Sequence, residues 1–205
     1  RILGTYMNEA LKMFDEGVDA KSIDNAIVKI GFPMGPLALM DHVGLDVCAD
    51  VISEDRILAM DEKTRLEVSF TAKKMHDEGG LLGKKGGKGF YLYDHKTGKK
   101  SSVNSSVDTL IERGSQNKIP LIDIQNRLLY SLLNEAALTL SEGIISNPKD
   151  GDIGAIFGMG FPPFEGGPFR MLDKNLELIL TQMEELVDQY GERFKPVDFL
   201  KEHQK

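Results

Sequence analysis

The stretch that determines the fold is Gly31-Phe32-Pro33-Met34-Gly35-Pro36-Leu37-Ala38-Leu39-Met40-Asp41. It contains helix-breaking residues followed by the start of an apolar helix. Gly31 can adopt a left-handed conformation that ends one helix, and Pro33 cannot continue one. Pro36 already has the φ angle that the first turn of a new helix requires. The stretch therefore predicts a rigid corner with few side chains, suited to be a wall against which a ligand or another domain packs.

The same corner recurs as Gly160-Phe161-Pro162-Pro163-Phe164-Glu165-Gly166-Gly167-Pro168-Phe169-Arg170-Met171-Leu172-Asp173, which indicates an internal repeat. With a few inserted residues, the two copies align position by position: Arg1 with Arg127, Asn8-Glu9-Ala10 with Asn134-Glu135-Ala136, Glu16-Gly17 with Glu142-Gly143, Asp24 with Asp152, Gly31-Phe32-Pro33 with Gly160-Phe161-Pro162, Gly35-Pro36 with Gly167-Pro168, and Asp41 with Asp173. Two similar helical units in one chain are expected to pack face to face about a pseudo-twofold axis, as a homodimer would.

Apolar residues at helical spacing predict an all-α fold of two tandem helical copies packed as a pseudo-dimer. Helices are expected at about 2–14, 22–30, 36–43, 46–58, 64–77, 106–113, 122–142, 151–158, 169–190 and 196–203, with Asp46 as an N-cap and Pro196 in the first turn of the last helix. The run 90–93 is the one strand-like segment, and the polar residues 94–106 are predicted to be a linker. The resulting division is a first repeat at 1–93, a linker with a short helix at 94–120, and a second repeat at 121–205.

Composition limits the class of protein. The 205 residues are 41% hydrophobic and 28% charged, which is ordinary for a globular chain of one or two domains. A formal net charge of −7 argues against a general nucleic-acid binder, and no apolar run is long enough for a transmembrane helix. Cys48 is the sole cysteine, so an intrachain disulfide is impossible, and a small apolar role on a helix is favoured for it.

Two glycine-rich segments invite a phosphate-binding interpretation, which we reject. Residues 79–89 lack the Ser or Thr that follows Gly-Lys in a P-loop, and no strand precedes them, so a turn and hairpin is favoured. Gly158-Met159-Gly160 lacks the third glycine of a dinucleotide fingerprint. Lys84, Lys85 and Lys88 are expected on a solvated surface, with contact to an anionic partner or a ligand phosphate as the open alternative.

Polar and aromatic residues near the corners leave further alternatives. His42 is favoured as a surface or helix-packing residue over a general base, and the sequence contains no metal-ligand spacing of the His-Glu-x-x-His type. The pairs Asn8-Glu9 and Asn134-Glu135 lie on apolar helices, where buried polar groups need hydrogen-bond partners, so a structural role is favoured over ligand contact. For Phe157, core packing and a ligand wall are equally compatible with the sequence.

The residues quoted above resemble the C-terminal helical domain of 3-hydroxyacyl-CoA dehydrogenases. The first copy carries Asn8-Glu9-Ala10, the corner, the run Leu39-Met40-Asp41-His42-Val43-Gly44-Leu45-Asp46 and the closing Lys88-Gly89-Phe90-Tyr91-Leu92-Tyr93. The second copy, from Gly151 to Arg170, resembles the alpha subunits of multifunctional fatty-acid oxidation enzymes, in which one chain carries both copies.

The resemblance implies an oxidoreductase of lipid metabolism that oxidises the 3-hydroxyl of an acyl-CoA in fatty-acid β-oxidation. NAD would be bound by a Rossmann domain outside this sequence, which would also hold the catalytic His and Glu, and an enoyl-CoA hydratase domain would precede it. A family Asn that contacts substrate would lie just before Arg1. The resemblance implies that Phe157, where relatives have an aromatic, and Pro33, Met34 and Gly35 bind substrate. No catalytic, cofactor-binding or metal-binding residue is expected in the chain itself.

The remaining expectations concern context. Because Arg1 begins without a cap or an initiator Met, we expect a fragment of a longer enzyme, inactive by itself. Its expected partners are its own Rossmann and hydratase domains and the acyl-CoA substrate. The resemblance also points to a thiolase subunit as a further candidate partner. A bacterial cytoplasmic location is expected, or a mitochondrial or peroxisomal one in a eukaryote. The competing hypothesis is a structural or oligomerisation module that never meets substrate.

Overall fold

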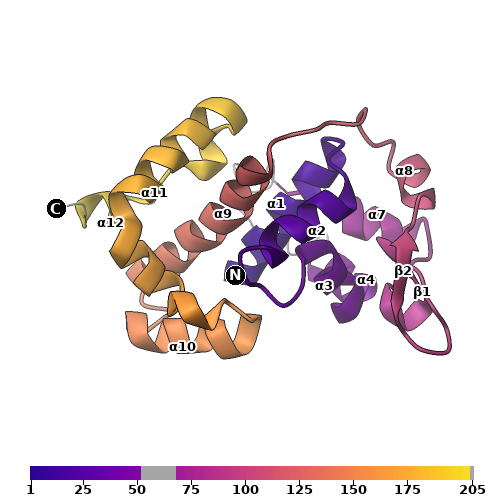
Figure 1. Cartoon of the computed structure of the whole chain (residues 1–205), viewed down its shortest axis with the longest axis horizontal. Helices are drawn as coiled ribbons and strands as arrows, with labels where there is room; N and C mark the ends of the chain where they lie inside the picture. The colour runs from indigo at the N-terminus through magenta and orange to yellow at the C-terminus, as the bar shows by residue number, and fades with distance from the viewer. Residues whose placement is uncertain (52–67, 204–205) are drawn as a thin grey trace. The chain divides into compact units, whose positions relative to one another are not determined.

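The computed structural model describes residues 1–51 and 68–203, and these residues are mostly helical, as predicted (Figure 1). The elements are α1 (Ile2–Asp15), α2 (Ala20–Val28), α3 (Pro36–Val43), α4 (Leu45–Val51), α7 (Thr71–Asp77), the 3-10 helix η1 (Lys84–Gly86), β1 (Tyr91–Tyr93), β2 (Lys100–Val103), α8 (Ser106–Leu110), α9 (Leu121–Ser141), α10 (Pro148–Met159), η2 (Pro163–Glu165), α11 (Pro168–Tyr190), η3 (Glu192–Phe194) and α12 (Asp198–Glu202).

Contacts group the chain into two compact units. Unit 1 consists of Arg1–Glu9, Ala26–Pro33 and Pro120–Lys205, and unit 2 consists of Ala10–Asn25 and Met34–Ile119. These boundaries follow spatial proximity and differ from those of the sequence repeats at 1–93 and 121–205, so the division into repeats stays a prediction.

Several helix ends lie where chain breakers predict them. The helix α3 runs from Pro36 to Val43, as expected, and Gly44 follows it with a φ of 107°. Gly17 and Gly31, the predicted stops of α1 and α2, have φ angles of 94° and 105°. These left-handed conformations are accessible to glycine without the penalty that a Cβ would bring.

Other boundaries differ from the prediction, each for a local reason. The helix α2 begins at Ala20 because the carboxylate of Asp19 accepts a hydrogen bond from the N–H of Ser22. Asp46 lies inside the first turn of α4 instead of capping it, and Pro196 precedes α12, which begins at Asp198. The predicted helical residues 52–58 and 64–67 lie outside the described residues.

Residues 100–103 form the strand β2 instead of an irregular linker. This strand pairs antiparallel with β1, with Tyr91 opposite Val103 and Tyr93 opposite Lys100, and an irregularity lies between the two pairs. Three of its four residues are exposed, so it lacks the alternation of apolar and polar side chains that marks a strand in sequence. The predicted short helix that follows is confirmed as α8.

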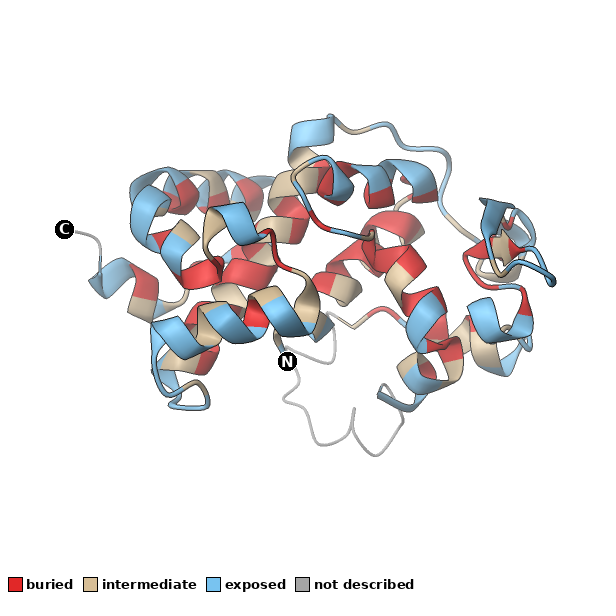
Figure 2. Cartoon of the chain, turned by 60° about the horizontal axis from the view of Figure 1, so that its bottom comes forward, coloured by how far each residue is buried: buried red, intermediate tan, exposed pale blue. Residues whose placement is uncertain are grey.

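Each unit has its own apolar core, and buried residues lie on the inward faces of its helices (Figure 2). In unit 1, α9 and α11 pack together and bury Leu128, Leu132, Leu133, Ala136, Ile179, Met183 and Leu186. In unit 2 the rings of Phe14 and Phe90 meet edge to face at 5.3 Å. Within the part of the chain that the structure describes, no helix is both long and apolar enough to cross a bilayer.

Candidate functional site

The first corner is built around Asp24. Its carboxylate accepts hydrogen bonds from the backbone N–H groups of Leu37 (2.9 Å) and Ala38 (3.1 Å), the first turn of α3, and from the hydroxyl of Tyr91 (2.7 Å). A Cβ on Gly35 would lie 2.3 Å from the Cβ of Asp24, so only glycine leaves room for this carboxylate. Burial raises the pKa of Asp24, and the hydrogen bonds act against that rise.

The second corner repeats the arrangement within unit 1. The carboxylate of Asp152 accepts hydrogen bonds from the N–H groups of Phe169 (2.8 Å) and Arg170 (3.4 Å) at the start of α11. A Cβ on Gly167 would lie 2.3 Å from an oxygen of Asp152. Asp, Gly and Pro at matched positions thus build the same cap twice, and the difference is that Asp152 is only partly buried.

The two Gly-Phe-Pro runs contact each other inside unit 1. The rings of Phe32 and Phe161, which are matched positions, meet edge to face with centroids 5.4 Å apart. A Cβ on Gly31 would lie 3.2 Å from the Cβ of Pro162, and one on Gly160 would lie 2.7 Å from the Cγ of Pro33. Each glycine therefore receives the proline of the other copy, and this reciprocity is the mark of an isologous, twofold contact.

The helices α1 and α9 show the same reciprocity within unit 1. Arg1 pairs with Glu135 at 2.6 Å, and Arg127 pairs with Glu9 at 2.6 Å. The hydroxyl of Thr5 donates to the carbonyl of its own counterpart, Ser131, at 3.4 Å. These contacts agree with the expected pseudo-twofold packing of the two copies.

The polar pairs on these helices have structural partners, the role that the sequence favours. Glu9 is 2% exposed and lies between the guanidinium groups of Arg127 and Arg193. The side-chain amide of Asn134 donates to the carbonyl of Lys195 at 2.9 Å and accepts from the N–H of Val197 at 3.0 Å. The pairs therefore tie the segment after α11 to helices α1 and α9.

Asp41 is the second buried carboxylate of unit 2. It accepts hydrogen bonds from the N–H groups of Phe90 (2.9 Å) and Tyr91 (3.0 Å) and from the hydroxyl of Tyr93 (3.0 Å). Burial raises the pKa of Asp41 to about 6, and these three donors oppose the rise. Its counterpart Asp173 is exposed, so the two copies differ here.

Two glycines of the 79–89 segment, Gly83 and Gly89, are required by their close packing against Asp41. A Cβ on Gly83 would lie 2.4 Å from the carbonyl oxygen of Asp41, and one on Gly89 would lie 1.9 Å from its carboxylate. The backbone N–H of Gly83 donates to the carbonyl of Lys88, and that of Lys88 donates back to Gly83. The segment therefore does not fit a dinucleotide cradle, and the described residues hold no group of three or more His, Cys, Asp or Glu suited to a metal ion.

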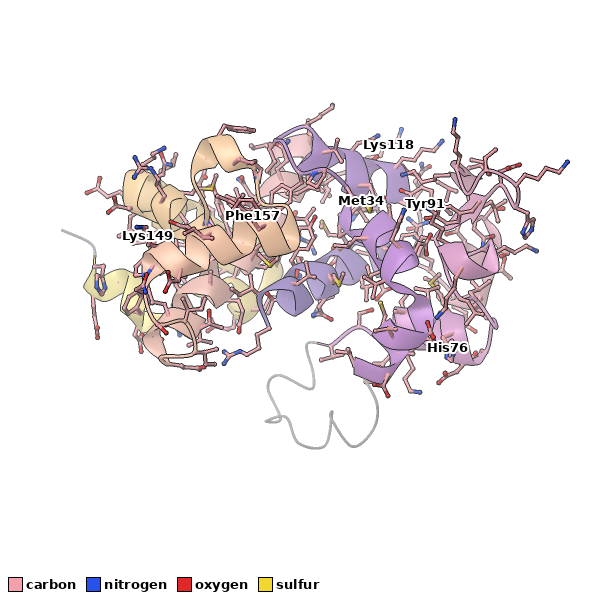
Figure 3. The ribbon with its side chains drawn as sticks, turned by 90° about the horizontal axis from the view of Figure 1, so that it is seen from below. Met34, His76, Tyr91, Lys118, Lys149 and Phe157 are labelled. Atoms are coloured by element: carbon pink, nitrogen blue, oxygen red, sulfur yellow. The ribbon has the colours of Figure 1, made fainter. Side chains whose placement is uncertain are left out.

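The residues predicted to contact substrate have different exposures. Phe157 lies on α10 with 87% of its surface exposed, which excludes core packing within this chain (Figure 3). Pro33 is exposed, Met34 is half-buried, and Gly35 is buried against Asp24. Phe164, which the sequence analysis does not single out, is 71% exposed and lies over Gly31. Unit 1 therefore presents aromatic surface on α10 and η2.

The other singled-out side chains are accounted for locally. His42 is exposed at the end of α3, and its Nδ1 lies 2.8 Å from the carbonyl oxygen of Ala38. Cys48 is half-buried on α4, where burial raises the pKa of its thiol to about 11. The thiol is therefore protonated at neutral pH, in agreement with the apolar role favoured for it.

The fold and its corners match known proteins. Residues 1–93 match the sequence model of the 3-hydroxyacyl-CoA dehydrogenase C-terminal domain. The dehydrogenase part of multifunctional enzyme 1 from C. elegans has a TM-score of 0.68 and 29% identity, over 98% of this chain and 46% of that one. The 3-hydroxybutyryl-CoA dehydrogenase from Escherichia coli has a TM-score of 0.69 at 20% identity, over 98% of this chain and 58% of that one, and supports the fold alone.

The chain thus resembles the C-terminal helical region of the 3-hydroxyacyl-CoA dehydrogenase class in fold, and residues 1–93 match that region in sequence, so the predicted resemblance is confirmed. More particularly, it is similar to the fatty acid oxidation complex subunit alpha of Idiomarina loihiensis (43% identity) and of Shewanella amazonensis (43% identity), in each case over 98% of this chain. The chain spans 28% of the length of these relatives.

Proposed function

We propose that this chain is the duplicated C-terminal helical region of an NAD-dependent 3-hydroxyacyl-CoA dehydrogenase of fatty-acid β-oxidation. The observation that carries the proposal is the match of residues 1–93 to the family's C-terminal domain, together with the second Asp-capped corner at Asp152 and Gly167. The similarity to fatty acid oxidation alpha subunits over nearly the whole chain supports the multifunctional form of this enzyme.

In this proposal the chain supplies shape and the exclusion of water. Phe157, Pro33, Met34 and Gly35 are the residues proposed to form one wall of the acyl-CoA cleft, and the exposure of Phe157 supports its part in that wall. NAD, held by a Rossmann domain outside this chain, would accept the hydride. The groups that transfer the proton would also lie on that domain.

The proposal extends to organisation and context. Residues 1–93 and 121–205 would be the two copies, with 94–120 as the connection that contains β2 and α8. The partners would be the enzyme's own Rossmann and hydratase domains and the acyl-CoA substrate, with a thiolase subunit as a further partner. The bacterial relatives support a cytoplasmic location.

The alternative is a structural module that organises domains or subunits without touching substrate. The reciprocal contacts of Arg1 with Glu135 and of Arg127 with Glu9 favour it, because they are those of an assembly interface. The exposed ring of Phe157 is available to contact substrate, and we therefore place this alternative second.

Substitution of Phe157 separates the two proposals. In the full-length protein, Phe157→Ala is expected to lower kcat/KM for a 3-hydroxyacyl-CoA by about tenfold, because a lost wall contact weakens binding of substrate or transition state. Ile144→Ala, which truncates another exposed apolar side chain of unit 1, is the matched control and should leave kcat/KM unchanged. Unchanged kinetics for Phe157→Ala, with altered assembly or stability, would favour the structural module.

The isolated chain provides a second test. It is expected to fold and yet to catalyse no reduction of NAD by a 3-hydroxyacyl-CoA, because the groups that transfer the proton and accept the hydride would lie outside it. A helical far-UV circular dichroism spectrum would establish folding, and absorbance at the NADH maximum would report activity. Any NAD reduction above a blank that lacks the chain would contradict this assignment of roles.

A further inference from the structure

A hollow with a volume of about 410 Å³ lies in unit 2. Its walls come from the end of α3, from η1 and from the turn between β1 and β2. The side chains that line it are those of His42, Lys84, Lys85, Tyr93, Asp94 and His95, so one carboxylate lies among the nitrogen groups. Cationic and ionisable nitrogen groups therefore gather here on a chain whose formal net charge is −7.

Lys84 has an imidazole as its partner in this hollow. Its ammonium lies 3.2 Å from the Nε2 of His42, whose Nδ1 lies 2.8 Å from the carbonyl oxygen of Ala38. A carbonyl only accepts, so Nδ1 carries the proton, and in that tautomer Nε2 accepts from the ammonium of Lys84. This contact uses one N–H donor of the ammonium and leaves two for other acceptors. Within the described residues, no carboxylate lies at ion-pair distance from Lys84.

The second imidazole, that of His95, lines the same hollow and packs on Gly87. A Cβ on Gly87 would lie 2.6 Å from the Cε1 of His95, so the ring packs directly on the backbone of η1's last turn. Gly87 has a φ of 77°, which a side chain would disfavour as well. The ring of Tyr93 meets that of His42 edge to face at 6.1 Å and forms a rigid wall.

The nearby carboxylates are engaged by other groups. Asp94 accepts hydrogen bonds from the backbone N–H groups of Lys96 (3.1 Å) and Thr97 (2.7 Å) and so belongs to the hairpin turn. Asp46 pairs with Lys85 at 2.5 Å. The charge of Lys84 is therefore left without an anionic partner among the described residues.

We propose that this hollow binds a phosphate group, held by Lys84 and His95 with Lys85 at its edge. A tetrahedral anion with several acceptor oxygens suits donors that converge from η1 and the hairpin turn, and lysine is a common phosphate ligand. The phosphate could be free or could be the monoester of a larger molecule. The inference rests on the geometry of unit 2 and does not depend on the proposed enzymatic activity.

Phosphate titration of the chain at constant ionic strength tests the proposal. Inorganic phosphate is expected to shift the imidazole NMR signals of His42 and His95, and calorimetry gives the affinity. Lys84→Met, which keeps the apolar stem, should weaken binding about tenfold or more, as loss of a charged hydrogen bond does. Lys118→Met, which removes another exposed lysine of unit 2, should leave the affinity unchanged.

Further arms identify the source of the phosphate and guard against misfolding. Coenzyme A that binds where dephospho-coenzyme A does not would identify a phosphomonoester of a larger molecule, and binding of inorganic phosphate alone would identify the free ion. Equal thermal unfolding temperatures for Lys84→Met and the parent chain would show that the variant folds. His95→Gln is the second variant, for which weaker phosphate binding is also expected. The proposal fails if neither probe binds, or if Lys84→Met and Lys118→Met weaken binding equally.

Discussion

At the scale of single residues, the corners depend on an aspartate that lies far from them in sequence. Asp24 precedes the N–H of Leu37 by 13 residues, so the local pattern around Pro36 predicts a helix start and not its cap. The sequence signal for this cap is the alignment of Asp24 with Asp152. An Asp that precedes the Gly-Pro pair in both copies indicates the same structural role in both. Which backbone groups such an Asp contacts, however, can be seen only in the folded structure.

Asp41 predicts a pH dependence of stability. Its pKa is raised in the folded state, so between about pH 4 and pH 6 the folded chain binds more protons than the unfolded chain. Its contribution to the free energy of unfolding is therefore fully present below its unfolded pKa and is lost as the pH rises through about 6. The size of this loss is up to about 3 kcal/mol.

Urea unfolding at pH 4.5 and pH 6.5 provides the measurement. The decrease in unfolding free energy across this interval should be smaller in Asp41→Asn, because the amide does not titrate. Comparison of the two slopes removes the pH-independent cost of the substitution. An identical slope in both proteins would show that Asp41 titrates normally in the folded chain.

At the scale of elements, the two capped helices predict unequal sensitivities. Asp24 is buried and also receives the hydroxyl of Tyr91, whereas Asp152 is partly exposed and its hydrogen bonds come from the start of α11. Asp24→Ala would leave buried donors without acceptors and should cost about 3 kcal/mol of unfolding free energy. Asp152→Ala should cost about 1 kcal/mol, the typical loss of a helix cap. Chemical denaturation of both variants checks the order, and equal losses would contradict it.

How well an element can be predicted depends on where its signal lies. The bounds of α3 can be predicted from Pro36 and Gly44, because each of these residues restricts or frees the backbone at its own position. The helix α10 begins at Pro148, before the predicted start at about 151, although Pro148 behind the cap Asn147 is a local signal. The strand β2 carries little such signal, because its side chains face solvent and it exists through its pairing with β1.

At the scale of the whole molecule, the matched ion pairs differ in burial and therefore in energy. Arg127 is fully buried and shares Glu9 with Arg193, whereas Arg1 beside Glu135 has 43% of its side chain exposed. Glu9→Gln would leave buried cationic charge uncompensated and should cost about 3–5 kcal/mol. Glu135→Gln should cost less than about 1 kcal/mol, as exposed pairs do. Thermal and urea unfolding of both variants measures the difference, and similar losses would refute the assignment.

The candidate site was predictable in part. The repeat indicates that two corners exist and are alike, since their residues match in order. It does not indicate that Phe32 meets Phe161, nor that Phe157 points to solvent, because both facts depend on how helices separated by more than a hundred residues pack. The hollow at Lys84 likewise required the structure to bring His42, η1 and the hairpin turn together.

The self-paired contacts have an evolutionary consequence. In a homodimer, one codon change alters both sides of the axis at once, so paired positions cannot drift apart. In one chain the matched positions are encoded separately and can differ: Thr5 faces Ser131, and Asp41 is buried on its hairpin while Asp173 is exposed. A twofold contact can thus persist while the residues on its two sides, and the surfaces around them, become unlike.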